Sequence, residues 1–219
     1  MKRKNIIFII VLVCLILVCG LIAVYSNRKK ETLDYANVLG NTAVTVDGNV
    51  LTIRDLAFYI AYEESEVEKQ AVIYNPDDTN AYWKLHINGE FLKVSARNAA
   101  MNMAIHDEIF YQMANEEGIA LSDEEMELLK EKQDEFWSDL SDEAKEKIIV
   151  SQDELNAAME RIAVVQKYQM IYAELQNKTY DDYEFNGDSY ETLLASHEVV
   201  INSDVWERLD FGNITLEHE

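Results

Sequence analysis

The chain has 219 residues with one proline, seven glycines and two cysteines, and 48% of its residues are hydrophobic. This length fits one or two domains, and the scarcity of Pro and Gly excludes collagen-like and Pro/Gly-rich disordered proteins and favours long helices. Residues 1–30 hold six of the 19 basic residues and no acid, so residues 31–219 carry 13 basic and 41 acidic residues, a net charge of −28. Such an acidic body repels phosphate backbones, which argues against nucleic acid as a partner.

The first thirty residues have the pattern of a membrane anchor. Three basic residues precede an apolar run of 19 residues, Ile6–Val24, and three more occupy positions 28–30. About 20 helical residues cross a hydrocarbon core of roughly 30 Å, whereas a cleavable signal peptide usually has an apolar region of about 7–15 residues. We therefore expect a single-pass signal anchor that contacts the membrane through residues 6–24, with the C-terminal body outside the cytoplasm. Cleavage near Ser26 and lipidation of Cys19 stay open as alternatives.

A β-hairpin is predicted after a linker over residues 31–42. Ala43–Val46 and Asn49–Ile53 are rich in β-branched residues, and they flank the dipeptide Asp47-Gly48. Both positions of such a dipeptide accept the positive φ of a two-residue hairpin turn, which makes this a strong local signal.

Helices are predicted through most of the remaining body. Thr52 followed by Asp55 resembles a helix N-cap, and Pro76 ends the first helix. Ser122 and Ser151 each precede a glutamate by three residues, which is the capping-box pattern of a helix start. The predicted helices are Asp55–Ile73, Glu90–Glu117, Ser122–Trp137, Ser141–Ile148 and Ser151–Leu175.

The C-terminal segment, residues 177–219, has a different character. Aromatic residues alternate with acids at its beginning, and two short strands are predicted at His197–Ile201 and Phe211–Leu216. The predicted fold is therefore mainly α, with an N-terminal transmembrane helix and a small β-hairpin.

The sequence predicts no catalytic residue, metal site or cofactor. Both cysteines, Cys14 and Cys19, lie in the apolar run, and the four histidines are scattered without a zinc-binding spacing. No Gly-rich phosphate loop, nucleophile elbow or EF-hand loop is present. His106, Asp107 and Glu108 occupy successive helical positions that point in different directions, so a core or solvated histidine is favoured over an acid–base group.

Three segments, in this order and spacing, resemble the N-terminal chaperone domain of the SurA/PrsA family of extracytoplasmic folding factors. They are Val44–Thr52, Met113–Glu125, and Val150–Leu155 with the helix that continues to Lys167-Tyr168. The resemblance covers residues 43–176. Many members carry a parvulin prolyl-isomerase domain after this region, but only residues 177–219 follow here, without the parvulin His and Cys/Asp pattern. The resemblance therefore implies the binding part of such a protein without its isomerase.

The family implies a fold and a function for this chain. A C-terminal segment completes the N-terminal domain in the family, so we expect residues 177–219 to fold back and pair Glu198–Ile201 or Phe211–Leu216 with the hairpin. The implied function is that of a membrane-anchored holdase, which binds unfolded or exported polypeptides reversibly and is not an enzyme. Adaptable Met and aromatic side chains suit such a role. The candidate client-binding residues are Tyr59, Tyr62, Trp83, Phe91, Phe110, Tyr111 and Met113.

Core packing is the simpler interpretation of each of these seven residues. The main functional alternative is a dedicated interaction or assembly subunit of a cell-envelope or secretion complex. A prolyl isomerase with an unrecognised site is the third possibility, and it is disfavoured by the short C-terminal segment.

Overall fold

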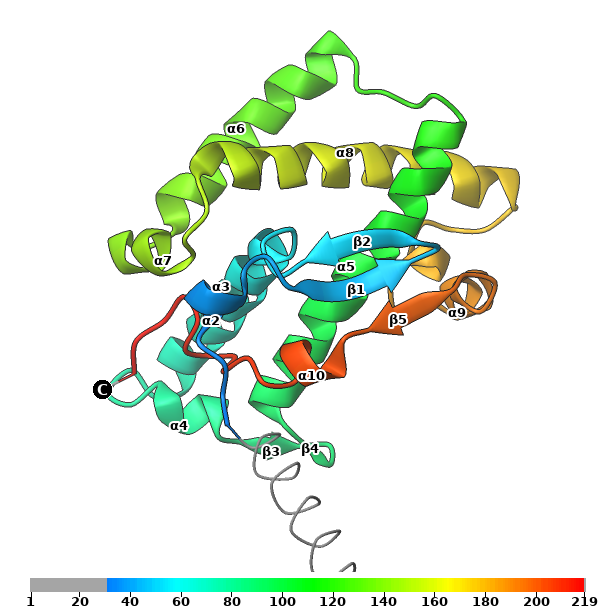
Figure 1. Cartoon of the computed structure of the whole chain (residues 1–219). Coiled ribbons are helices and arrows are strands. Elements are labelled where there is room, and N and C mark those ends of the chain that lie inside the picture. The colour runs from blue at the N-terminus through cyan, green and yellow to red at the C-terminus, as the bar shows by residue number, and fades with distance from the viewer. Residues whose placement is uncertain (1–30, 219) are drawn as a thin grey trace, which may run out of the picture.

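The computed structural model describes residues 31–218, and this part of the chain is mainly helical with a small antiparallel sheet (Figure 1). The elements in chain order are α2 (Tyr35–Val38), β1 (Thr42–Val46), β2 (Asn49–Thr52), α3 (Ala57–Tyr74), α4 (Asn80–Trp83), β3 (His86–Ile87), β4 (Glu90–Phe91), α5 (Leu92–Glu116), α6 (Asp123–Asp139), α7 (Asp142–Lys147), α8 (Gln152–Leu175), the 3-10 turn η1 (Asp181–Tyr183), α9 (Asp188–Leu194), β5 (Val199–Ile201) and α10 (Ser203–Trp206).

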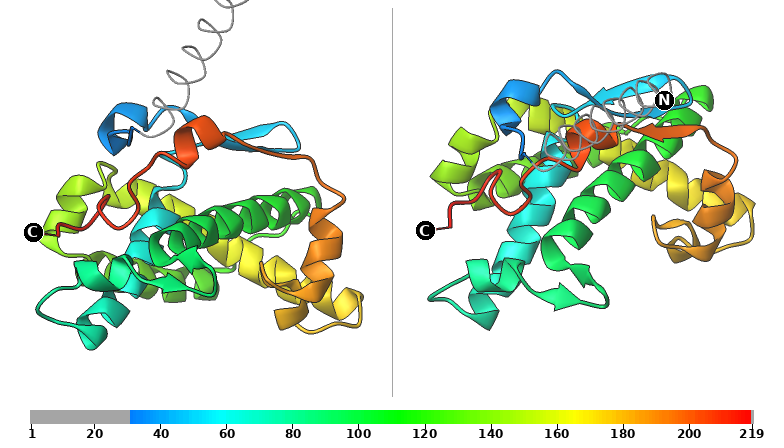
Figure 2. Two further views of the ribbon diagram at one scale, coloured as in Figure 1. Left: turned by 90° about the horizontal axis from the view of Figure 1, so that it is seen from below. Right: turned by 60° about the horizontal axis from the view of Figure 1, so that its bottom comes forward.

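The long helices form the centre of the fold. Helix α5 packs against α3 and α8, while α6 contacts α8 and the β-sheet covers another side of α5 (Figures 1 and 2). The core between them combines alanines with large apolar side chains, among them Ile60, Ile109 and Phe110. The small side chains allow the helices to pack closely, and the large ones fill the space that remains between them.

The predicted helix starts are confirmed where capping boxes occur. Ser122 Oγ accepts a hydrogen bond from the backbone N–H of Glu125 (3.3 Å), whose carboxylate accepts one from the N–H of Ser122 (2.7 Å). Ser151 and Glu154 make the same pair of contacts at the start of α8. Each box satisfies two backbone donors that a helix N-terminus would otherwise leave unpaired.

The sheet has the strand order β2–β1–β5, and all its pairs are antiparallel. Asp47 (φ 49°) and Gly48 (φ 85°) form the predicted hairpin turn between β1 and β2. Strand β5 pairs Val200 with Thr45 on the other edge of β1, so the chain does fold back onto the hairpin through the first of the two predicted strands. The second prediction is wrong, because Phe211–Leu216 forms turns and bends instead of a strand.

Residues 31–42 are not a linker. They contain α2, whose N-cap Asp34 accepts a hydrogen bond from the N–H of Ala36, and Tyr35 and Val38 are buried in the core. Leu33 forms a parallel bridge with Leu209, so the start of the described chain lies beside the segment that follows α10. The segment is short and polar on average, so its sequence resembles a linker. Its contacts with the C-terminal residues explain why it is ordered.

The C-terminal segment contributes more to the core than its sequence indicates. Helices α9 and α10 were not predicted, and Tyr190, Trp206, Phe211 and Ile214 are each at most 5% exposed. The backbone of residues 212–215 is held by Glu64 of α3, which is itself fully buried. Residues 177–218 therefore complete the same core that the helices begin.

The predicted membrane anchor lies outside the described residues. Within residues 31–218, none of the helices combines the length and the hydrophobicity that crossing a bilayer requires. The prediction for residues 1–30 stands on the sequence alone.

Candidate functional site

Two adjoining cavities lie between α3, α5 and α8, and together we call them the α3–α8 groove. The first, of about 220 Å³, opens beside the hairpin, and the second, of about 350 Å³, lies toward η1. Phe58, Tyr59 and Asp107 line both cavities. Small side chains from all three helices line the first cavity, namely Ala57 of α3, Ala104 of α5, and Ala157 and Ala158 of α8. The apolar lining of the second includes Tyr62, Met103, Ile162, Val165 and Phe185.

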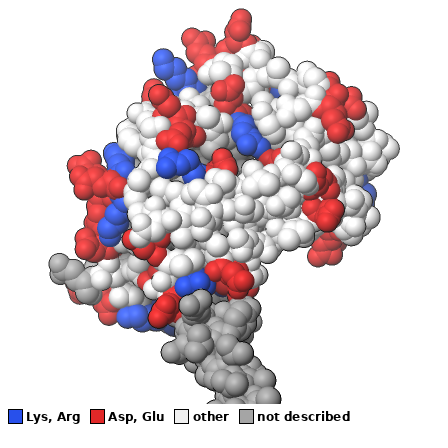
Figure 3. Space-filling view, in the orientation of Figure 1, with Lys and Arg blue, Asp and Glu red and all other residues white. Residues whose placement is uncertain are grey.

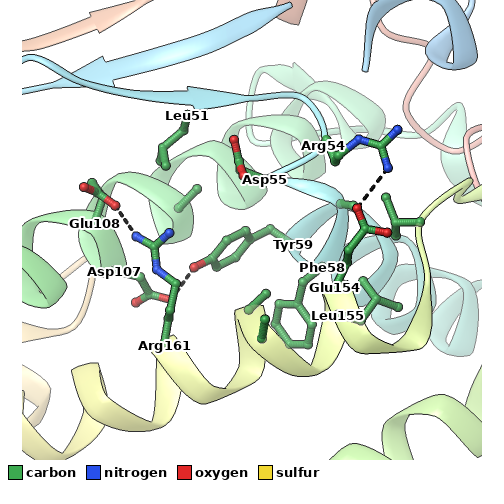
Figure 4. Close-up of a pocket in the computed structure, with 15 residues that line it drawn as sticks. Leu51, Arg54, Asp55, Phe58, Tyr59, Asp107, Glu108, Glu154, Leu155 and Arg161 are labelled. Atoms are coloured by element: carbon green, nitrogen blue, oxygen red, sulfur yellow. Dashed lines mark hydrogen bonds and ion pairs between the residues drawn. The ribbon is translucent and has the colours of Figure 1, made fainter. Parts of the chain in front are cut away.

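The first cavity has polar ends and an apolar middle (Figure 4). Figure 4 shows Arg161, Glu108 and Asp107 at one end and the Arg54–Glu154 ion pair at the other, with the ring of Phe58 between them. Such an arrangement suits an apolar side chain that enters between two polar rims.

Arg161 links α8 to α5 and the sheet at this cavity. Its guanidinium donates to the carboxylate of Glu108, whose side chain is 6% exposed, and lies 4.3 Å from the ring centre of Tyr111. The amide of Gln112 donates both to Glu108 (2.9 Å) and to the carbonyl of Val46 in β1 (3.2 Å). The buried charge of Glu108 thus has a cation and an amide donor, as buried carboxylates require.

Removing Arg161 is expected to destabilise the protein more than removing Arg54, although both arginines pair with a glutamate at the same cavity. Arg161→Ala leaves the buried Glu108 carboxylate without its cation, which should cost about 2 kcal/mol of unfolding free energy. Arg54 and Glu154 are each 44% exposed, so Arg54→Ala should cost less than about 1 kcal/mol. Urea unfolding of both variants measures the difference. Equal losses would show that the buried Glu108 carboxylate does not depend on Arg161 more than the exposed Glu154 depends on Arg54.

Tyr59, Asp107 and His106 form a hydrogen-bonded chain that separates the two cavities. The Tyr59 hydroxyl donates to Asp107 (2.9 Å), and the other carboxylate oxygen of Asp107 lies 2.8 Å from Nδ1 of His106. Nε2 of His106 donates to the carbonyl of Tyr183 (2.8 Å), because a carbonyl can only accept. Burial and the neighbouring Asp107 carboxylate raise the pKa of Tyr59 well above its usual value, so its hydroxyl stays a donor.

His106 belongs to the core. It is 6% exposed and lies 4.9 Å, between ring centres, from both Phe110 and Tyr190. Asp107, its neighbour in α5, nevertheless reaches its Nδ1, so adjacent helical residues do meet here. The hydrogen bond from His106 to the Tyr183 carbonyl connects α5 to η1 beside the second cavity, which His106 lines.

The seven predicted client-binding residues do not form one surface. Trp83 and Phe110 are at most 2% exposed, and the Trp83 indole donates to Glu68 (2.8 Å). Phe91 is 52% exposed but lies on β4, at the opposite end of α5 from Tyr111 and Met113. Only Tyr59 and Tyr62 line the groove. Helical spacing identified the apolar faces correctly, but it does not say which part of a face another element covers.

The sequence reasoning missed most residues that do line the groove. Phe58 precedes a predicted residue, and its ring stacks at 6.0 Å on Tyr62 and lies 4.9 Å from Phe136 of α6. A signal for the α8 side of the groove was present in the sequence, because Ala157 and Ala158 are two adjacent small residues one helical turn before Ile162.

The groove lining combines apolar side chains with hydrogen-bonding groups. Among the described residues, no group of three or more His, Asp or Glu side chains is placed to hold a metal ion. Arg54 and Arg161 each carry five N–H groups, more than one carboxylate contact uses, so both retain donors that a peptide carbonyl can accept. Comparison with family models, with curated proteins and with solved structures found no match to this chain.

Proposed function

We propose that this protein is a membrane-anchored, extracytoplasmic holdase, which binds unfolded or exported polypeptides reversibly and catalyses no isomerisation. The observation that carries the proposal is the α3–α8 groove, where apolar and aromatic side chains border open space and polar groups stand at the ends. An apolar client side chain gains roughly 1.5–3 kcal/mol when it is fully buried, which is enough for transient binding at a few contacts and too little for permanent capture.

Two other features support the proposal. The segment order resembles the SurA/PrsA N-terminal domain, and strand β5 pairs with β1 as that resemblance implies. The net charge of −28 over residues 31–219 keeps a client-loaded protein soluble by electrostatic repulsion.

Filling the groove should weaken holdase activity without unfolding the protein. Ala157 is an exposed residue of the groove wall, so Ala157→Trp places a ring over the first cavity without disturbing the core. We expect about tenfold weaker suppression of client aggregation, since the loss of roughly 1.4 kcal/mol of apolar contact is a factor of ten in affinity. The measurement is light scattering of several unrelated unfolded clients diluted from denaturant into residues 31–219.

The matched control is Leu128→Trp on α6, which adds the same side chain at a position that is 60% exposed and lines neither cavity. This control should suppress aggregation as the wild type does. If the folded wild type suppresses no client, the holdase proposal is wrong. If both tryptophan variants behave alike, the groove is not the binding site.

A dedicated interaction or assembly subunit is the second candidate, and exposed apolar side chains in two elements favour it. Ile73 and Tyr74 at the end of α3 are 78% and 59% exposed, and Ile87 and Phe91 of the β3–β4 hairpin are also exposed. Exposed apolar side chains of this kind suit contact with one dedicated partner. Crosslinking in the native membrane distinguishes the two, because a subunit yields one main product and a holdase yields many.

A further inference from the structure

The outer face of the sheet is uncharged in an otherwise acidic body. The strands β1, β2 and β5 contain five, four and three residues, and none of them is charged. Val44 and Val46 point into the core, whereas Val50 (54% exposed) and Val200 (57%) flank Thr45 on the outside. Figure 3 shows the result, an area without charged side chains over the sheet with carboxylates around it. We call Thr45 and its two cross-strand partners, Val50 and Val200, the sheet face.

The described chain begins on the same side of the molecule as the sheet face. The left view in Figure 2 shows α2, the sheet and α10 along one side, and the bridge between Leu33 and Leu209 places the start of the chain beside α10. Residues that precede Glu31 therefore enter the body on this side.

The predicted anchor is connected to this side by a short segment. Between Val24, the last residue of the apolar run, and Glu31 lie six residues, which span at most roughly 25 Å when fully extended. A compact body of this size is roughly 40 Å across. A connection shorter than the body keeps the side that carries it nearest to the bilayer.

We infer that the sheet face rests on the surface of the bilayer that holds residues 6–24, an inference that depends on the proposed membrane anchoring. The charge pattern selects this face, because a carboxylate-rich surface is repelled by anionic lipid and pays a desolvation cost at any lipid surface, whereas exposed valines do not. The contact is shallow, at the depth of the headgroups. It also covers exposed aliphatic side chains that would otherwise favour association with other molecules.

The test uses the full chain with Cys14 and Cys19 replaced by Ala, inserted into phosphatidylcholine vesicles that contain a nitroxide-labelled phosphatidylcholine. A single cysteine at Val200→Cys or at the control position Leu128→Cys carries a fluorescent label, and the two positions are almost equally exposed in the protein. Because an interfacial face sits roughly 5–10 Å deep in the headgroup region, we expect about threefold stronger quenching at residue 200 than at residue 128. Adding Val50→Asp to the Val200→Cys chain should lower its quenching to the level of residue 128.

Separate outcomes test the anchoring and the orientation. Flotation of the protein with the vesicles reports the anchor, and a chain that does not float overturns both the anchoring and the inference. A chain that floats but shows equal quenching at both positions overturns only the orientation. Disulfide-linked dimers of the unlabelled Val200→Cys chain, together with no quenching of the labelled chain, would identify a second copy of the chain as the occupant of this face, which also overturns the inference.

Discussion

Replacing Glu64 with Gln is expected to lower the free energy of unfolding by about 4 kcal/mol. Oε1 of Glu64 accepts hydrogen bonds from the backbone N–H groups of Gly212 (2.5 Å) and Ile214 (3.2 Å), and Oε2 accepts from the N–H (2.6 Å) and hydroxyl (2.5 Å) of Thr215. An amide NH₂ in place of either oxygen faces two donors from which it cannot accept. Each buried donor left unpaired costs roughly 1–3 kcal/mol. Urea unfolding of residues 31–219 measures the loss.

The matched control is Glu66→Gln in the same helix. Glu66 is 44% exposed and pairs with Lys69 at the surface (2.7 Å), so its loss should cost less than about 1 kcal/mol. Equal losses at residues 64 and 66 would mean that the negative charge of α3 matters and that the contact with the C-terminal segment does not.

The pH dependence of the unfolding free energy reports the protonation of Glu64 in the folded protein. Burial raises the pKa of Glu64 above its usual 4.5, and the hydrogen bonds from residues 212–215 only partly oppose this. A carboxyl whose pKa is higher in the folded state contributes its full stability below pH 4.5 and loses it as the pH rises through the folded pKa. The stability difference between wild type and Glu64→Gln should therefore shrink from pH 4.5 upward.

The carboxyl of Glu125 affects stability in a different pH range. Lys167 and the capping contacts of Ser122 lower the pKa of Glu125 to about 2, so the stability that it contributes is present above pH 4.5 and is lost as the pH falls toward 2. This loss is common to the wild type and the Glu64→Gln variant and cancels in their difference. A difference that stays constant above pH 4.5 would contradict the raised pKa of Glu64.

Local signals predicted the parts of the fold that depend on local chemistry. The Asp47-Gly48 turn forms because the two residues accept positive φ, and α6 and α8 begin at Ser122 and Ser151 because their capping boxes satisfy nearby donors. Phe211–Leu216 alternates apolar and polar residues like a strand, but its backbone N–H groups find Glu64, about 150 residues earlier in the chain. No local pattern encodes a partner at that separation.

A weaker signal for Glu64 was present in the sequence. Glu64 follows Ile60 by four residues and precedes Ala71 by seven, which places an acid on the buried stripe of α3. An acid at such a position needs donors from another segment, because a buried carboxylate without them is too costly. The sequence contains a weaker signal for the groove, because the groove walls come from three helices whose relative positions are determined by tertiary packing.

A second large loss is expected for Gly212→Ala, about 3 kcal/mol of unfolding free energy. Gly212 has φ +89°, and a Cβ there would lie 2.8 Å from Cε3 and 2.9 Å from Cδ2 of Trp83. Trp83 is 2% exposed and its indole donates to Glu68, so the ring cannot turn aside without leaving a buried donor unpaired. The variant combines about 1 kcal/mol of strain at positive φ with overpacking that typically costs 1–3 kcal/mol.

Gly118→Ala is the matched control, because Gly118 also has positive φ (+68°) but its Cβ would meet nothing within 4 Å. This variant should lose only the strain of about 1 kcal/mol, and equal losses at the two glycines would show that the approach to Trp83 is unimportant. Gly212 and Glu64 hold the same segment, so the double variant Glu64→Gln/Gly212→Ala should lose less than the sum of the single losses. Once residues 212–215 are released by the loss of the Glu64 hydrogen bonds or of the close packing at Gly212, the remaining contact stabilises less of the folded structure. Additive losses would mean that the two contacts act on the fold independently.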